Sequence, residues 1–177
     1  MKRIASHFCF CSPDRILRRM VIEQDENYVV NRIFGLDEGN VESANTLFFD
    51  GILSAEVISL KEHTKFENPE RIIKDYDYYD FSEVVPTTAI QRSNKSLLLD
   101  FGTNNCHAIT EKLHLLTTFL CDYSVFEIIA ACTYFPALVL KKQAELTAPI
   151  CTKIILWENI DLIGKKITQH SSIREIE

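Results

Sequence analysis

The residues best suited to chemistry are three polar side chains at helical spacing in the second half of the chain. His107, Glu111 and His114 stand at positions i, i+4 and i+7, which places them on one face of an α-helix. Imidazole nitrogens and a carboxylate oxygen are ligands that zinc accepts, and His63 could supply a fourth. The solvated face of an ordinary helix shows the same spacing and is much commoner. We therefore expect no resident metal or other cofactor, with zinc as the alternative.

The six cysteines show no metal-binding or redox motif. They stand at positions 9, 11, 106, 121, 132 and 151, form no C-x-x-C pair and lie mostly in apolar sequence. Cys9 and Cys11 would point to the same face of a strand, but two thiols without further ligands do not make a zinc site. The pattern indicates reduced, buried cysteines in a cytoplasmic protein. Five glycines in the whole chain also argue against a glycine-rich nucleotide loop.

Length and composition exclude several classes of protein. The chain has 177 residues, 46% of them hydrophobic, and a net charge of −6, so it can bury a core but offers no basic surface for nucleic acid. The longest uncharged apolar run, Ile128–Leu140, is shorter than the roughly 20 residues that cross a bilayer. The N-terminal sequence lacks the apolar run and cleavage site of a signal peptide. We expect a cytoplasmic protein that binds neither membrane nor nucleic acid.

The elements that must position these residues are strands at both ends of the chain. Alternating apolar residues predict strands over 3–10, 19–24, 28–34 and 46–49, then short apolar runs at 52–53 and 57–58. Asp25-Glu26-Asn27 is predicted to be a hairpin turn, and Asp50-Gly51 a second turn. Residues 64–86 show no clean period and are predicted to form a loop or a short helix over the core.

Helices are predicted between these strands. One apolar stripe is formed by Ile109, Leu113, Leu116 and Leu120. Ser124 and Glu127 match a capping box that opens a second helix ending at Thr133. Pro136 is predicted to be the first residue of a third short helix that continues over 137–143, because proline fits the first turn.

The run from Phe48 to His63 resembles a segment of the amidohydrolase superfamily, especially its chlorohydrolase and nucleobase-deaminase branch. In that family a strand of a small β-sandwich leads into the first strand of a TIM barrel, where the two histidines of an H-x-H motif bind the catalytic metal. The apolar half of the motif is matched by Gly51, Ile52, Leu53, Val57 and Ile58. The H-x-H itself is replaced by Lys61-Glu62-His63.

Two later segments resemble the last barrel strands of the same family. Gln91–Asn94 is similar to a C-P-x-S-N motif, and Phe101–Asn105 is similar to l-G-T-D-S, whose Asp binds the metal and shuttles a proton. That Asp is replaced here by Asn104. The helices that follow, and the strand Ile154–Trp157, resemble the family's last helices and its return to the sandwich.

The resemblance implies an α+β fold with no complete TIM barrel. Residues 1–60 together with 146–177 would form a composite β-sandwich, and 61–145 a shortened, mainly helical barrel remnant. A complete eight-stranded barrel takes on the order of 250 residues, far more than this middle segment provides.

The resemblance also implies a protein without catalytic residues. Lys61 is a cation that would repel a divalent metal, Asn104 cannot take up a proton, and His63 alone remains of the first metal-binding pair. We therefore expect a non-catalytic protein with a structural or interaction role. The alternative is a residual zinc-dependent hydrolase or deaminase that acts on C–N bonds of a cyclic amide or amidine.

Loss of the barrel should leave apolar helix faces without cover. Leu115 with Phe119, and Ile128 with Ile129, would lie on such faces, and a large apolar patch is rarely open on a soluble monomer. We therefore expect a homodimer, because two-fold dimers are the commonest soluble assembly. A monomer covered by Lys65–Val85 as a lid is the alternative.

Overall fold

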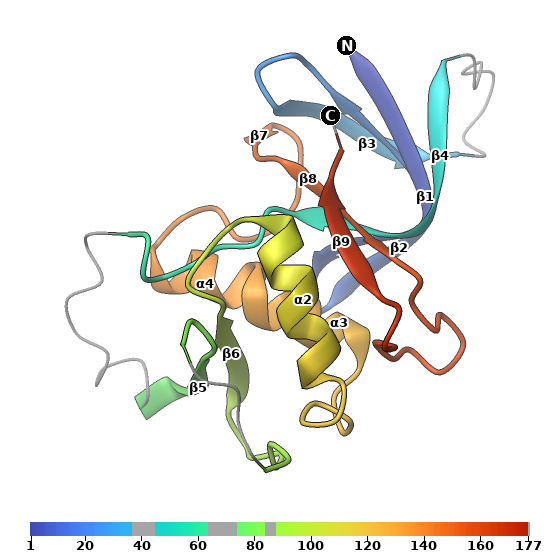
Figure 1. The fold of residues 1–177 in the computed structure, drawn as a ribbon. Coiled ribbons are helices and arrows are strands. Elements are labelled where there is room, and N and C mark those ends of the chain that lie inside the picture. The colour runs from blue at the N-terminus through green and yellow to red at the C-terminus, as the bar shows by residue number, and fades with distance from the viewer. Residues whose placement is uncertain (37–44, 64–73, 84–87, 177) are drawn as a thin grey trace.

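The computed structural model describes residues 1–36, 45–63, 74–83 and 88–176 (Figure 1). The strands are β1 (Lys2–Ser12), β2 (Arg15–Gln24), β3 (Val29–Gly35), β4 (Thr46–Ala55), β5 (Tyr76–Asp80), β6 (Ser96–Asp100), β7 (Ile150–Cys151), β8 (Ile154–Glu158) and β9 (Ser172–Glu175). The helices are α2 (Cys106–Leu116), α3 (Val125–Cys132) and α4 (Tyr134–Val139). The result is an α+β fold rich in strands.

Strands from both ends of the chain build one curled seven-stranded sheet, in the order β7-β3-β2-β1-β4-β8-β9. β1, β2 and β3 form an antiparallel meander, whereas β4 lies parallel to β1. β8 pairs antiparallel with β4, with Trp157 opposite Ile52 and Ile154 opposite Ala55. The prediction that the first 60 and the last 30 residues share one sheet system is therefore confirmed.

Successive residues of the central strands enter different cores, as the period of two in a strand requires. On one face Cys9, Leu53 and Leu156 join a cluster that is enclosed by the sheet itself. On the other face Ile52 and Trp157 pack into the larger cluster, which includes the helices. Because both faces are covered, β8 is apolar at every position from 154 to 157.

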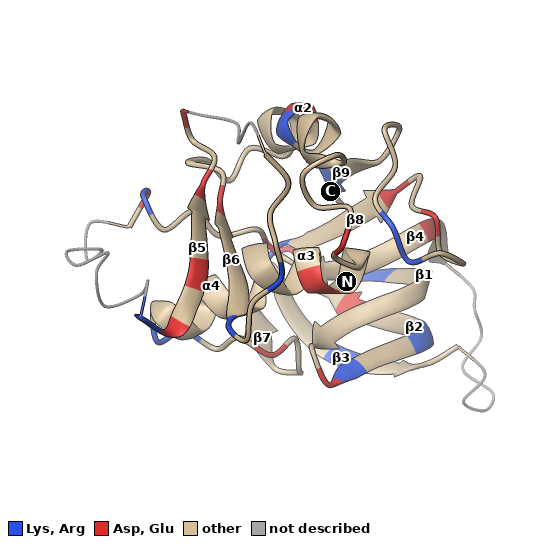
Figure 2. Cartoon of the chain, turned by 90° about the horizontal axis from the view of Figure 1, so that it is seen from below, with Lys and Arg blue, Asp and Glu red and all other residues tan. Residues whose placement is uncertain are grey.

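A second layer consists of α2, α3, α4 and the small parallel sheet of β5 and β6 (Figure 1). Leu97 and Leu99 of β6 point into the core between the layers, and Leu98 packs against Tyr76 and Tyr78 on the other side. Acidic residues recur along β5 (Figure 2). Two parallel strands are all that the described part of the chain contributes to a barrel-like sheet.

The prediction of a loop or short helix for residues 64–86 was wrong at 76–80. Residues 76–80 form strand β5, because Tyr76 and Tyr78 alternate with acidic residues and cover Leu98. Positions 64–73 and 84–86, and most of the proposed lid over 65–85, lie outside the described residues.

Three predicted boundaries also need correction. Asp50-Gly51 is not a turn: β4 runs through it, and Gly51 forms a bulge opposite β1 at a φ of 153°. Residues 57–58 form no strand. Instead, the Ile58 N–H is hydrogen-bonded to the carbonyl of Cys132 at the end of α3, at 2.9 Å. β2 begins at Arg15 rather than at 19, since the Ser12–Arg15 hairpin is tight enough to continue the ladder.

The helix predictions held in their apolar pattern and failed at both boundaries of the third helix. Ile109, Leu113 and Leu116 are buried on α2, and the capping box of Ser124 and Glu127 opens α3. α4 begins at Tyr134, two residues before Pro136, and ends at Val139. Proline fits there because the first turn of a helix leaves its N–H groups without intrahelical partners.

The burial of several predicted residues differs from expectation. Ile128 and Ile129 are buried in the chain's own core, so the helix face that carries these two residues is not bare as expected. Leu115 is exposed, and Phe119 packs partly against that core. Cys121 and Cys151 are exposed rather than buried, while the other four cysteines are fully or partly buried. Among the described helices, none has the length and apolar character needed to cross a membrane.

Candidate functional site

The three positions that the sequence resemblance singled out lie together beyond the carboxyl ends of β5 and β6. The chain from β4 to Lys61, here called the crossing segment, passes these ends. The Lys61 ammonium lies 2.7 Å from Asp80 Oδ2 and 2.6 Å from Ser82 Oγ. Hydrogen bonding to Asp80 raises the pKa of Lys61 above its ordinary value. Lys61 is therefore a cation held in an ion pair.

Asn104 and His63 are also committed to protein partners. Asn104 Oδ1 accepts a hydrogen bond of 2.7 Å from the backbone N–H of Ser59, and its amide nitrogen donates to Glu62 Oε2 at 2.6 Å. His63 Nε2 lies 3.3 Å from the ammonium of Lys142. A divalent cation does not fit these donors, because two ammonium groups stand among them and the amide oxygen already has a partner.

Sequence reasoning missed Asp100, the most completely buried acid of this region. The side chain ends β6 with no exposed surface. Oδ1 accepts from Ser59 Oγ and Gly102 N, both at 2.9 Å, and Oδ2 accepts from Lys61 N at 3.1 Å and Tyr78 OH at 3.4 Å. Burial, followed by the charge of Asp100, raises the pKa of the Tyr78 hydroxyl. Asp100 thus ties the crossing segment to β6 and has no acceptor position left for a ligand.

The polar residues of α2 do not meet in a metal site. His107 Nε2 lies 3.7 Å from Glu111 Oε1, and both side chains are exposed. His114 instead donates from Nε2 to the carbonyl oxygen of Ser171 at 2.7 Å, which turns it toward the loop before β9. The described residues contain no group of three His, Cys, Asp or Glu side chains placed to hold a metal ion.

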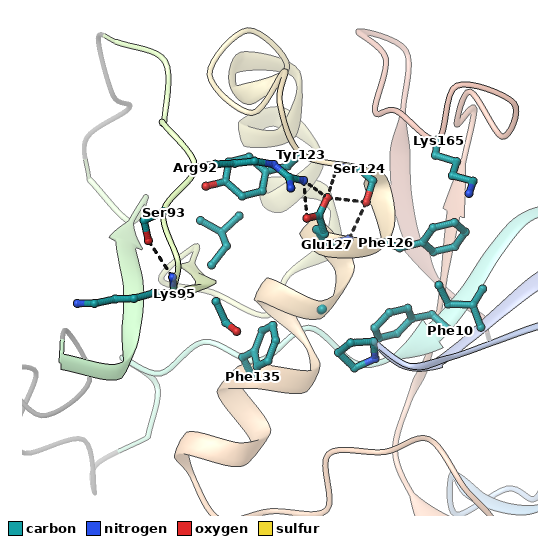
Figure 3. A pocket seen from close by; sticks show the side chains of 15 residues that line it. Phe10, Arg92, Ser93, Lys95, Tyr123, Ser124, Phe126, Glu127, Phe135 and Lys165 are labelled. Atoms are coloured by element: carbon teal, nitrogen blue, oxygen red, sulfur yellow. Dashed lines mark hydrogen bonds and ion pairs between the residues drawn. The ribbon is translucent and has the colours of Figure 1, made fainter.

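A separate cavity of about 490 Å³ lies beside α3 and faces the β1–β2 hairpin and the segment before β6 (Figure 3). Its walls combine aromatic rings, aliphatic groups, hydroxyls and charged side chains. The lining residues are Phe10, Pro13, Ile16, Arg92, Ser93, Lys95, Ser96, Leu97, Tyr123, Ser124, Phe126, Glu127, Ala130, Phe135 and Lys165.

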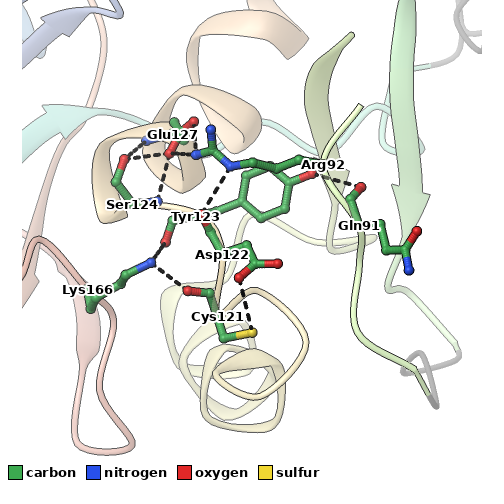
Figure 4. Close-up of polar contacts among 8 residues, drawn as sticks. All are labelled: Gln91, Arg92, Cys121, Asp122, Tyr123, Ser124, Glu127 and Lys166. Atoms are coloured by element: carbon green, nitrogen blue, oxygen red, sulfur yellow. Dashed lines mark hydrogen bonds and ion pairs between the residues drawn. The ribbon is translucent and has the colours of Figure 1, made fainter. Parts of the chain in front are cut away.

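One side of this cavity is fixed by a polar network around Glu127 (Figure 4). Arg92 Nη2 lies 2.5 and 2.6 Å from the two carboxylate oxygens of Glu127, and Arg92 Nε donates to the Asp122 carbonyl at 3.1 Å. The guanidinium also lies 5.2 Å from the ring centre of Tyr123. Ser124 N donates to Glu127 Oε2 at 2.7 Å, which completes the capping box. The wall is therefore in place without a ligand.

Only parts of this cavity could be recognised from the sequence. Gln91–Asn94 was singled out as a motif remnant, and Ser124 with Glu127 as a helix start, but the ion pair between them was not foreseen. Arg92 and Glu127 are 35 positions apart, so only the packing of β6 against α3 brings them together. Phe10 arrives from the far end of the sequence in the same way.

The chain was compared with protein-family models, curated proteins and solved structures, and none of them matches it. The contacts of its own residues are therefore what a functional proposal must rest on.

Proposed function

We propose that this chain is a non-catalytic relative of the amidohydrolases with a structural or interaction role. In this proposal, the curled sheet from residues 1–60 and 146–177 corresponds to the family's composite β-sandwich. The part over 61–145 corresponds to the last barrel segments. β6, which carries Phe101–Asn105 at its carboxyl end, takes the place of the family's last barrel strand.

The observation that carries the proposal is the use of the former metal positions as structural contacts. Lys61 stands where the first histidine of H-x-H would be, and its ammonium pairs with Asp80. Asn104 stands where the metal-binding Asp would be, and it joins the backbone of Ser59 to Glu62. Both side chains lock loops to one another, so neither a metal ligand nor a proton carrier remains at these positions.

Metal analysis and a hydrolysis assay test this proposal directly. We expect the purified protein, incubated with zinc, manganese or iron and then desalted, to retain well under one equivalent of metal. We also expect no hydrolysis of cytosine or hydantoin, which are probes for a cyclic amidine and a cyclic amide. A stoichiometric metal that His63→Ala removes but the exposed control His170→Ala leaves in place would contradict the proposal. Chelator-sensitive hydrolysis would contradict it equally.

The expected homodimer stays part of the proposal, now with a different contact surface. Leu47 and Phe48 of β4 are 52% and 49% exposed, although each is a large apolar side chain. In this part β4 pairs with β1 on one edge, and within the described chain β8 joins the other edge only from Ile52 onward. An open, apolar strand edge of this kind pairs readily with a second copy.

Light scattering distinguishes the two states. We expect a mass near twice 20.4 kDa at tens of micromolar, and a return to the monomer mass for Phe48→Lys. Exposed Leu138→Lys on α4 is the matched control, which should leave the mass unchanged. A monomeric wild-type chain would end the dimer proposal and leave the non-catalytic assignment untouched.

A further inference from the structure

We propose that the cavity beside α3 is a binding site for a small aromatic carboxylate. Its volume of about 490 Å³ falls in the range of roughly 300–1,000 Å³ that small-molecule sites occupy. This inference is independent of the proposed loss of catalysis, because the cavity shares no residue with the positions of Lys61, His63 and Asn104.

The apolar part of the cavity suits a flat ring. Phe10, Phe126 and Phe135 reach it from three different elements, and Leu97 and Ala130 lie among the same lining residues (Figure 3). Phe126 is held by an edge-on contact with the ring of Phe8, at 5.7 Å between centroids. Aromatic walls that are themselves packed favour a planar apolar ligand over a flexible one, since less side-chain freedom is lost on binding.

The charges around the cavity favour an anion. Arg92, Lys95 and Lys165 are cations and Glu127 is the one acid among the lining residues, so cations outnumber acids on the cavity walls. The whole chain has the opposite sign, with a net charge of −6. A positive cavity in an acidic protein concentrates small anions at that place.

Lys165 is the cation placed to meet a carboxylate. The guanidinium of Arg92 is occupied by Glu127 and by the Asp122 carbonyl. Among the described residues the Lys165 ammonium has no hydrogen bond or ion pair, and Lys165 and Phe126 both line the cavity (Figure 3). The Lys165 carbonyl accepts a hydrogen bond of 2.8 Å from Val125 N, which fixes this loop to the start of α3.

Together these contacts define the expected pose. The ring lies between the aromatic side chains, and the carboxylate points to the Lys165 ammonium at the rim. Ser124, whose hydroxyl is occupied by Glu127, stays part of the wall. The ligand adds a negative charge where one cation lacks a partner and displaces no ion pair of the protein.

Titration with naphthalene-2-carboxylate tests the proposal, with neutral naphthalene-2-carboxamide as the matched ligand. Calorimetry or ligand-observed NMR on the full chain is expected to give a Kd of about 1 mM or tighter for the acid. We expect the amide to bind at least about fivefold more weakly, because it lacks the charge that Lys165 meets. Ser96→Phe, which fills the cavity from its rim, should abolish binding of both.

Variants of two exposed lysines locate the carboxylate. Lys165→Gln should weaken the acid about fivefold and leave the amide unchanged, whereas Lys141→Gln, outside the cavity, should change neither. The proposal is overturned if the wild-type chain binds neither ligand, if acid and amide bind equally well, or if Lys165→Gln behaves like Lys141→Gln. Thermal unfolding of each variant confirms that it is folded before it is titrated.

Discussion

Replacing Gly51 by alanine should break the junction between the two ends of the chain. β4 passes through Gly51 at a φ of 153°, a backbone conformation that L residues rarely adopt. A Cβ built at this position would lie 2.1 Å from the backbone carbonyl oxygen of Trp157 on β8. Because the atom it meets belongs to the backbone, the two strands must separate to relieve the contact.

The expected loss of stability has two parts. The unfavourable φ costs about 1–3 kcal/mol for a residue with a Cβ. Displacing Trp157 strains its buried hydrogen bond from Nε1 to Ser54 Oγ, now 2.9 Å, whose loss costs about 1–3 kcal/mol. We expect a total of about 2–6 kcal/mol, which at about 2–4 °C per kcal/mol lowers the melting temperature by about 4–24 °C.

The assay can use the fluorescence of Trp157, the one tryptophan of the chain and the residue that the new methyl group would displace. Gly164→Ala is the matched control, since its Cβ would meet an exposed side chain, the Asp161 carboxylate at 2.3 Å, and not the backbone of another strand. We expect the control to lose less than about 1 kcal/mol. Equal urea midpoints for Gly51→Ala and the control would refute the close approach of β4 and β8.

Three further predictions concern charged and capping groups. Asp100→Ala should cost about 2–4 kcal/mol in urea unfolding, because buried donors that now bond its carboxylate would lose their acceptor. Ser124→Ala should cost about 1 kcal/mol by the same measurement through loss of the capping box on α3, and Ser124→Asp should restore most of it. Burial raises the pKa of Asp80, but hydrogen bonds, first from Lys61, outweigh this and place it below 3.8. Because the pKa of Asp80 is lower in the folded than in the unfolded chain, the stabilisation from its ionised carboxylate is fully present above the unfolded-state pKa. This stabilisation is lost as the pH falls through the folded-state pKa. Melting curves of Asp80→Asn should therefore differ from wild type at neutral pH and converge with it as the pH falls through the lowered pKa of Asp80.

Controls for these predictions come from exposed residues of the same type. Asp14→Ala and Ser96→Ala should each stay within about 0.5 kcal/mol of wild type in the urea assay. An Asp80→Asn curve that stays parallel to wild type at every pH would contradict the ion pair with Lys61.

Features that are local in sequence could be predicted from the residues alone. The meander over the first 35 residues follows from alternating apolar side chains, and Asp25 Oδ1 accepts from Asn27 N and Val29 N in the predicted hairpin turn. Ser124 and Glu127 lie three residues apart and cap each other, so their pattern is legible without the fold.

Features that depend on distant partners could not be predicted in this way. Asp100 was not predicted, because its role depends on Ser59, 41 positions earlier. Gly51 looked like a turn because Asp-Gly favours turns, but the close approach of Trp157 fixes its role. His114 shares the helical spacing of His107, yet the carbonyl of Ser171 turns its ring away. In each case the role of the residue depends on a contact with a residue distant in the sequence, and spacing along the sequence does not reveal such a contact.

The pairing of β4 with β8 also constrains how the protein can be made in the cell. Ile52 of β4 pairs with Trp157 of β8. More than a hundred residues must therefore be synthesised after Ile52 before this pair at the centre of the sheet can form. At about 5–20 residues per second, the N-terminal strands spend roughly 5–20 s with one edge unpaired. During that time the edge of β4 at Ile52 and Leu53 is open to the ribosome surface and to chaperones. The protein should therefore complete its folding only after residue 157 has left the ribosome, at a rate limited by this long-range pairing.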